Sequence, residues 1–140
     1  MDIRKIDDRL DAAPQIALED MKAIAGLGYR SVISNRPDGE EPGQPDAAQV
    51  KAAAEAEGLT FRHIPVTGAS MGPEAVAAMR AALDELPGPV LGFCRSGTRT
   101  TCLWGLASAG TRPAQELIET ARAAGYDLSP LKPRLENGPA

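Results

Sequence analysis

The sequence has 140 residues, of which 43% are hydrophobic and 24% charged, with a formal net charge of −4 at pH 7. This composition is typical of a single soluble globular domain with a sizeable core. The acidic balance and the lack of a basic patch argue against nucleic acid as a partner. The first ten residues lack the apolar region of a signal peptide, and no apolar run could cross a membrane, so we expect a cytoplasmic protein with no membrane partner.

The first third of the chain predicts a hairpin, a helix, a buried strand and a loop. The loop is the firmest of these predictions, because three prolines and two glycines within eleven residues exclude helix and strand. The helix is indicated by apolar residues at helical spacing before Gly26. In order, we expect edge strands at residues 3–6 and 9–13, a helix at 17–25, a strand at 30–35 and the irregular loop at 35–45.

The rest of the chain predicts helices that alternate with short apolar strands. Asp46 suits the N-cap of an alanine-rich helix, and Pro73 suits the first position of another. In order, we expect helices at residues 46–57, from Pro73 onward, 98–109 and 113–124, strands at 59–66 and 89–93, and an irregular tail after Tyr126. This alternation predicts an α/β fold: one three-layer domain over residues 1–140, with a mostly parallel sheet flanked by helices.

The predicted topology also places a site. In open α/β sheets, ligands bind outside the carboxyl ends of the parallel strands. The loops that follow Asn35, Val66 and Phe93 should therefore meet at one edge and together wall a single site.

The most informative stretch is the junction from Cys94 to Arg99, with the sequence CRSGTR. A strand ends there on a cysteine, and the chain turns directly into a helix. Backbone N–H groups and the helix dipole at such a junction create a concavity that favours anions. Positive charge of this kind also favours the thiolate form of a cysteine. Cys94 is therefore a candidate nucleophile rather than an inert buried thiol.

The other residues of this loop suit an anion-binding role. Gly97 permits the positive φ that the loop needs, and Ser96 and Thr98 offer hydroxyl groups. Arg95 and Arg99 supply positive charge, and Arg99 at the start of the helix could grip two oxygens of a tetrahedral anion while Arg95 points outward.

Two further residues have competing interpretations. His63 lies near the end of its strand and could act as an acid or base beside Cys94, although a lone strand histidine is more often structural. Cys102 is expected in the core, because one helical turn carries it away from the loop, too far for a disulfide with Cys94.

The loop resembles those of two families that use a cysteine nucleophile. Tyrosine and dual-specificity phosphatases have a Cys-x5-Arg loop, usually with a histidine before the cysteine and an aspartate general acid on a separate loop. Rhodanese-type sulfurtransferases have a shorter loop, often CRSG followed by arginine, and carry sulfur as a cysteine persulfide.

The whole chain more closely resembles the beta-lactamase-hydrolase-like, phosphatase-like family, which is also labelled a family of sulfur transferases. The matching segments are MDIRKI, SVISNRPDGEEPGQP, FRHIPV and GPVLGFCRSGTRTTCLWGLA, which together span most of residues 1–110. This resemblance implies a fold like that of dual-specificity phosphatases, in agreement with the α/β prediction.

The chain departs from the phosphatase pattern in three ways. Arg99 lies one position closer to the cysteine, Phe93 replaces the usual histidine, and no aspartate occurs between Val66 and Leu83. A missing general acid costs phosphoester cleavage a factor of typically 10² to 10⁴. Persulfide transfer needs an acid less, because sulfite or a thiolate departs unprotonated. Substitute acids could come from the proline-rich loop, where the candidates are Asp38, Glu40 and Glu41.

Three functions remain open at this point. The first is a sulfurtransferase or persulfide carrier in which Cys94 is the nucleophile and Arg99 helps to hold the substrate. The second is a phosphatase that forms a phosphocysteine on Cys94. The third is a non-enzymatic module that binds anions or senses redox state. In each case the expected partner is a small anion (persulfide, thiosulfate or phosphoester), and we expect no cofactor and no metal.

Overall fold

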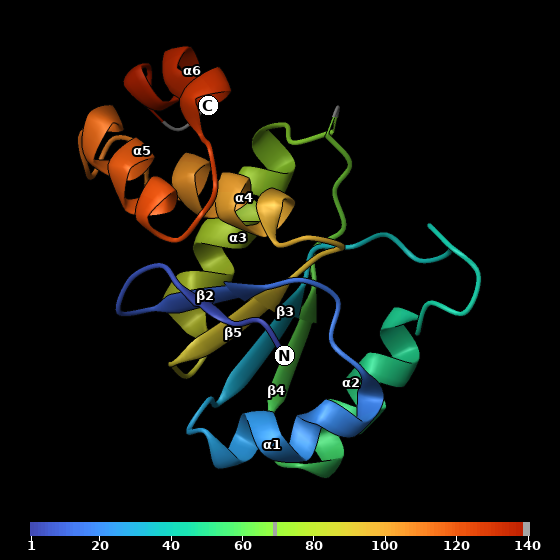
Figure 1. Ribbon diagram of the computed structural model, residues 1–140. Helices are drawn as coiled ribbons and strands as arrows, with labels where there is room; N and C mark the ends of the chain where they lie inside the picture. The colour runs from blue at the N-terminus through green and yellow to red at the C-terminus, as the bar shows by residue number, and fades with distance from the viewer. Residues whose placement is uncertain (69, 139–140) are drawn as a thin grey trace.

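The structure is a computed structural model that describes residues 1–68 and 70–138. Its centre is a five-stranded sheet in the order β1-β2-β5-β3-β4 (Figure 1). β1 pairs with β2 in antiparallel fashion, and the remaining neighbours are parallel. The strands are β1 (Arg4–Lys5), β2 (Leu10–Ala13), β3 (Ser31–Ser34), β4 (Thr60–His63) and β5 (Val90–Phe93).

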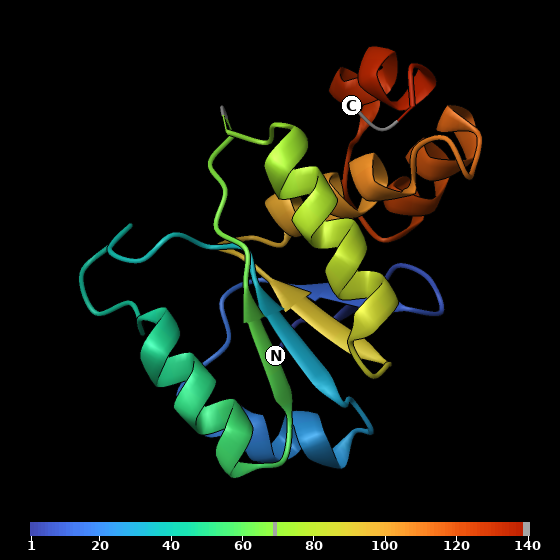
Figure 2. The ribbon, with the colours of Figure 1, turned by 180° about the vertical axis from the view of Figure 1, so that it is seen from behind.

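Helices cover both faces of this sheet, which confirms the predicted α/β fold with a mostly parallel sheet (Figures 1 and 2). Within the described residues, none of the helices combines the length and apolarity that crossing a bilayer requires. The α-helices are α1 (Met21–Gly26), α2 (Ala47–Ala56), α3 (Pro73–Glu85), α4 (Thr98–Ser108), α5 (Ala114–Ala123) and α6 (Lys132–Glu136), with two short 3-10 helices, η1 (Leu18–Asp20) and η2 (Ser129–Leu131).

The sheet separates two hydrophobic cores. Neighbouring residues of a strand face opposite cores, because side chains alternate across a sheet. In β3, Val32 faces the core under α1 and α2, whereas Ile33 faces the core under α3 and α4. In β5, Val90 faces the core under α3 and α4, and Leu91 faces the core under α1 and α2. A Cβ on Gly92 would overlap the Thr100 side chain, so this glycine lets α4 pack closely on the sheet.

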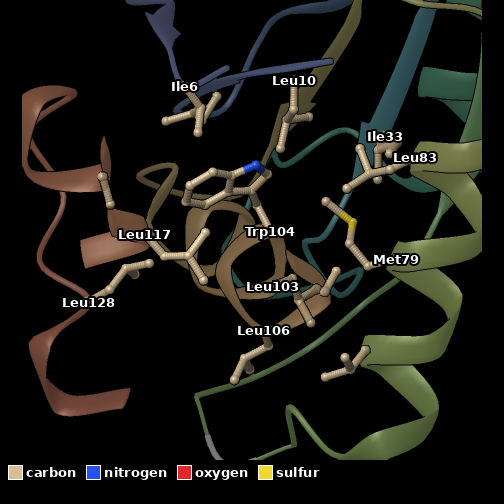
Figure 3. Packing of buried hydrophobic residues seen from close by; sticks show 14 of the residues in the cluster. Ile6, Leu10, Ile33, Met79, Leu83, Leu103, Trp104, Leu106, Leu117 and Leu128 are labelled. Atoms are coloured by element: carbon tan, nitrogen blue, oxygen red, sulfur yellow. The ribbon is translucent and has the colours of Figure 1, made fainter. Parts of the chain in front are cut away.

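The larger core surrounds Trp104 of α4, which is fully buried. Its indole ring points toward Ile6 and Leu10 (Figure 3), and its Nε1–H donates to Asp7 Oδ2 at 2.8 Å. Burying this side chain contributes a few kcal/mol of hydrophobic stabilisation. The hydrogen bond also ties α4 to the hairpin, which fixes the helix that begins at the CRSGTR junction.

Several element boundaries differ from the sequence prediction. The first helix starts as the 3-10 turn η1, and β4 ends at His63 rather than at Val66. The tail after Tyr126, expected to be irregular, instead contains η2 and α6. Leu128 and Leu135 of this tail are buried in the core beside α4, which explains why the segment is ordered into helical turns.

Candidate active site

The candidate site forms where β5 ends and α4 begins. Residues 94–97 make the turn, and Gly97 adopts a φ of +93°, a left-handed conformation that favours glycine. The loops that follow β3, β4 and β5 leave the sheet at this same end (Figures 1 and 2), as the parallel topology predicts. Residues distant in sequence therefore converge on the CRSGTR loop.

Cys94 lies at the centre of this loop and is fully buried. The backbone N–H of Gly97 donates to its Sγ at 3.0 Å, so at least one loop amide points at the sulfur. Both Cys94 and Cys102 are free thiols. Burial raises the pKa of Cys102 to about 11, which leaves its thiol protonated and unreactive at neutral pH.

Arg99, in the first turn of α4, folds back over the loop. Its Nη1 donates to Glu40 Oε2 at 2.7 Å and to the Val66 carbonyl at 3.0 Å, and its Nη2 donates to Glu40 Oε1 at 2.8 Å. The bonded Glu40 carboxylate raises the pKa of Arg99, and the nearby Cys94 adds to this rise. The guanidinium therefore sits between the cysteine and a carboxylate, gripping the latter with two hydrogen bonds.

The remaining predicted residues of the loop lie near its mouth. The Arg95 side chain is 70% exposed and comes no closer than 3.9 Å to Glu41 Oε2, so it points outward as expected. The Ser96 hydroxyl donates to Thr98 Oγ1 at 3.0 Å, which holds these two hydroxyls against each other. Both residues are exposed, within reach of an incoming ligand.

The three acidic residues proposed from the proline-rich loop take different positions. Asp38 accepts a hydrogen bond from the Ala47 N–H at 2.8 Å and so supports the start of α2. Glu41 lies 3.0 Å from Arg36 Nη2. Hydrogen bonds from Arg99 and then Arg36 lower the pKa of Glu40 to about 2, which opposes a role as a general acid in this state.

His63 takes a structural position. Its Nε2 is 2.9 Å from the Arg36 carbonyl oxygen, across the β3–β4 pair. The histidine also lines a cavity of about 680 Å³ at the start of α3, and neither Cys94 nor Arg99 lines this cavity. The acid or base role considered for His63 therefore gains no support from its contacts.

Four contributions to the site were not predicted. The Arg36 side chain, two residues after the end of β3, is buried, and its Nε donates to Glu40 Oε1 at 2.9 Å. The Gln15 side-chain oxygen accepts from Arg36 Nη1 at 2.9 Å, and the Gln15 backbone N–H donates to the Arg95 carbonyl. The Val66 carbonyl holds Arg99. Tyr126 lies over the loop, with its hydroxyl 3.3 Å from the Ser96 carbonyl oxygen.

Together these contacts describe an anion site. The guanidinium groups of Arg36, after β3, and of Arg99, in the first turn of α4, both bond the Glu40 carboxylate, and the Gly97 N–H donates to the Cys94 thiol. Carboxylates and phosphates bind arginine forks with the same geometry. Arg99 is thus able to form paired hydrogen bonds with an oxyanion, as it does with the Glu40 carboxylate.

Sequence comparison identifies the family. A model of the "Beta-lactamase hydrolase-like protein, phosphatase-like domain" matches residues 2–111. The beta-lactamase hydrolase-like proteins of Agrobacterium fabrum and Xylella fastidiosa (strain Temecula1) are 36% and 37% identical over 89% and 91% of the chain. The chain spans only 29% and 30% of the length of these two relatives.

Solved structures agree with this assignment. A protein of Neisseria meningitidis Z2491, described as a candidate phosphatase, is 42% identical with a TM-score of 0.86, over 98% of both chains. The catalytic core of the PP-IP phosphatase SIW14 from S. cerevisiae, solved with citrate, shares the fold at 15% identity, with a TM-score of 0.70 over 99% of this chain and 85% of that one. The chain therefore belongs to the family of the phosphatase-like domain of beta-lactamase hydrolase-like proteins.

Proposed function

We propose that this protein is a phosphatase that cleaves phosphoesters by nucleophilic attack of Cys94. The observation that carries the proposal is the double hydrogen bond of Arg99 to a carboxylate beside the buried cysteine. A guanidinium that grips two oxygens next to a thiol is arranged to hold a phosphoryl group for attack. The phosphatase-like family and the similar candidate phosphatase of N. meningitidis support the same function.

The proposed reaction has two steps. The thiolate of Cys94 attacks phosphorus, the bond to the leaving oxygen breaks, and the leaving group departs with the bonding electron pair as an alkoxide or phenoxide, which takes a proton from the solvent. The phosphoryl group is then held as a phosphocysteine. Water attacks this intermediate and gives up a proton to the solvent, the S–P bond breaks, and inorganic phosphate leaves as the thiolate is restored. The loop amides and Arg99 stabilise the charge on the equatorial oxygens in both steps.

The proposal includes a substrate preference. Asp38 accepts from the Ala47 N–H, Glu40 and Glu41 both contact Arg36, and Glu40 is ionised at all physiological pH values. Glu40, the carboxylate bonded to Arg99, is therefore not held as a protonated acid for the leaving group. We therefore expect the protein to act on phosphoesters whose leaving groups are stable as anions, such as phenols of low pKa.

Sulfur transfer was the main function inferred from the sequence. The family description and the solved relatives favour the phosphatase alternative instead, and neither names a sulfur substrate. The same Cys94 chemistry would serve both reactions, so the experiment must separate them.

The decisive experiment is turnover of p-nitrophenyl phosphate by the 140-residue chain, with Cys94→Ser and Cys102→Ser as a matched pair. Wild type and Cys102→Ser should release p-nitrophenol and phosphate, and Cys94→Ser should not. Circular dichroism establishes that each variant is folded.

Two results would contradict the proposed phosphatase function. If the folded wild type leaves aryl phosphates intact but gains one sulfur atom on Cys94 after exposure to thiosulfate or glutathione persulfide, the protein is a sulfur carrier. If Cys94→Ser hydrolyses the ester as fast as wild type, Cys94 is not the nucleophile.

A further inference from the structure

Arg36 is a buried charge with no role in the proposed reaction so far. Its side chain is only 1% exposed, although it lies two residues after the end of β3, at the edge where the site lies. Taking a guanidinium out of water is costly, and an apolar side chain of similar volume often serves stability equally well. A purely structural role is therefore a poor explanation for an arginine at this position.

The contacts of Arg36 point toward the anion site. Its Nε and Nη1 donate to Glu40 and Gln15. Its Nη2 lies 3.0 Å from Glu41 Oε1, but makes no hydrogen bond with any of the described residues. Buried donors without a partner are rare and cost about 1–3 kcal/mol. The Arg36 guanidinium is thus bonded to Glu40, the carboxylate that it shares with Arg99, while its Nη2 is ion-paired with Glu41 without a well-aligned hydrogen bond.

Glu40 links the two arginines. Its Oε1 accepts from Arg36 at 2.9 Å and from Arg99 at 2.8 Å, and its Oε2 accepts from Arg99 at 2.7 Å. These hydrogen bonds keep the carboxylate anionic, as its lowered pKa shows. A tetrahedral dianion has more oxygens than a carboxylate and accepts hydrogen bonds from both guanidinium groups in the same way.

We infer that Arg36 and Arg99 form a two-arginine site for the dianionic phosphate group, and that the Glu40 carboxylate occupies this site until phosphate replaces it. The inference rests on the proposed phosphatase function and names Arg36 as a second substrate-binding residue.

An internal competitor has a measurable consequence. Phosphate binds only those molecules in which Glu40 has left the site. The apparent affinity for phosphate is therefore the intrinsic affinity multiplied by the fraction of such molecules. Minor conformations of this kind are typically populated at 0.1 to 10%, so removal of the competing charge should strengthen anion binding about tenfold or more. Glu40→Gln keeps the shape of the side chain and removes its charge.

The test is calorimetric titration of the full chain with inorganic phosphate at neutral pH, which needs no turnover. Glu40→Gln should bind phosphate about tenfold or more tightly than wild type. The matched control is Glu85→Gln, which removes an exposed contact of 3.1 Å with Arg62 and should leave the affinity unchanged. Adding Arg36→Lys to Glu40→Gln should abolish the gain, because lysine lacks the planar fork.

A second measurement covers the case in which the Arg36 variant fails to fold. Iodoacetamide should alkylate Cys94 faster in Glu40→Gln than in wild type, and phosphate should protect it at lower concentration. Unchanged phosphate affinity and unchanged alkylation in folded Glu40→Gln would overturn the inference. Absence of turnover in every variant would instead overturn the proposed function, while the titration would still report on the two-arginine site.

Discussion

Tyr126 lies directly against Gly97, the glycine at which the CRSGTR loop enters α4. A Cβ on Gly97 would overlap the hydroxyl group of Tyr126 and come within 2.9 Å of its Cζ. The same tyrosine hydroxyl contacts the Ser96 carbonyl. The segment after α5 therefore covers one side of the loop and restricts what residue 97 can be.

Gly97→Ala should damage both stability and the site. Alanine must adopt the φ of +93° and also displace Tyr126, and strained backbone of this kind costs about 1–3 kcal/mol. Thermal unfolding measures the loss. Gly26→Ala is the matched control, since a Cβ there meets no atom within 4 Å. Equal stability of Gly97→Ala and wild type would contradict this packing.

The two arginines of the loop should differ in their effect on anion binding. Arg99→Lys should weaken the binding of inorganic phosphate by about 1–2 kcal/mol more than Arg95→Lys. Of these two arginines, Arg99 is the one that makes a paired set of hydrogen bonds in the site. Arg95 is largely exposed, so its replacement by lysine keeps the charge and loses little. Titration of both variants gives the comparison, and equal losses would show that the fork of Arg99 does not hold the anion.

The rate should depend steeply on the leaving group. With Glu40 ionised, no proton is supplied to the departing oxygen, and the missing acid is worth roughly 10² to 10⁴ in rate. A series of aryl phosphates with phenols of increasing pKa measures this dependence, with an alkyl phosphate as the slowest member. A rate that is independent of the leaving group would mean that an acid is present.

Glu40 should stabilise the fold only where it is charged. Its pKa is lowered from 4.5 to about 2 in the folded chain, so its contribution is complete above about pH 4.5 and disappears as the pH falls through about 2. The difference in melting temperature between wild type and Glu40→Gln, measured across this range, should shrink toward zero at the acid end. A difference that stays constant with pH would exclude the ion pairs as its origin.

Much of the fold follows from local sequence patterns. Alternating apolar strands and helices predicted the parallel sheet, and Asp46 predicted the start of α2, where its Oδ1 accepts from the Gln49 N–H at 2.8 Å. Such signals act within a few residues and need no tertiary contact. The edge hairpin was predicted for the same reason, since Asp7 caps its turn by accepting from the N–H of Arg9 and Leu10.

The ordered tail was not predictable in this way. α6 has only five residues and contains Pro133, and so short a helix is unstable by itself. It exists because Leu135 is buried against distant parts of the core, a contact that no local pattern reveals.

The site was predicted in outline but not in its connections. The strand-loop-helix junction identified Cys94 and Arg99, and the edge rule correctly brought the loop after β3 to them. That rule did not choose among the charged residues of the loop. Arg36 could have been noticed, because it lies two residues after a buried strand at the same edge, whereas Tyr126 depends on how the segment after α5 folds back.

The central claim is that Cys94 attacks phosphorus, and the intermediate itself gives the most direct test. Wild type mixed with p-nitrophenyl phosphate and quenched in neutral denaturant should carry one phosphoryl group on the peptide that contains Cys94, as measured by mass spectrometry. Cys94→Ser should carry none, and Cys102→Ser should match wild type. A protein that turns over the ester while Cys94 stays unmodified, or carries the phosphoryl group on another residue, would contradict the account.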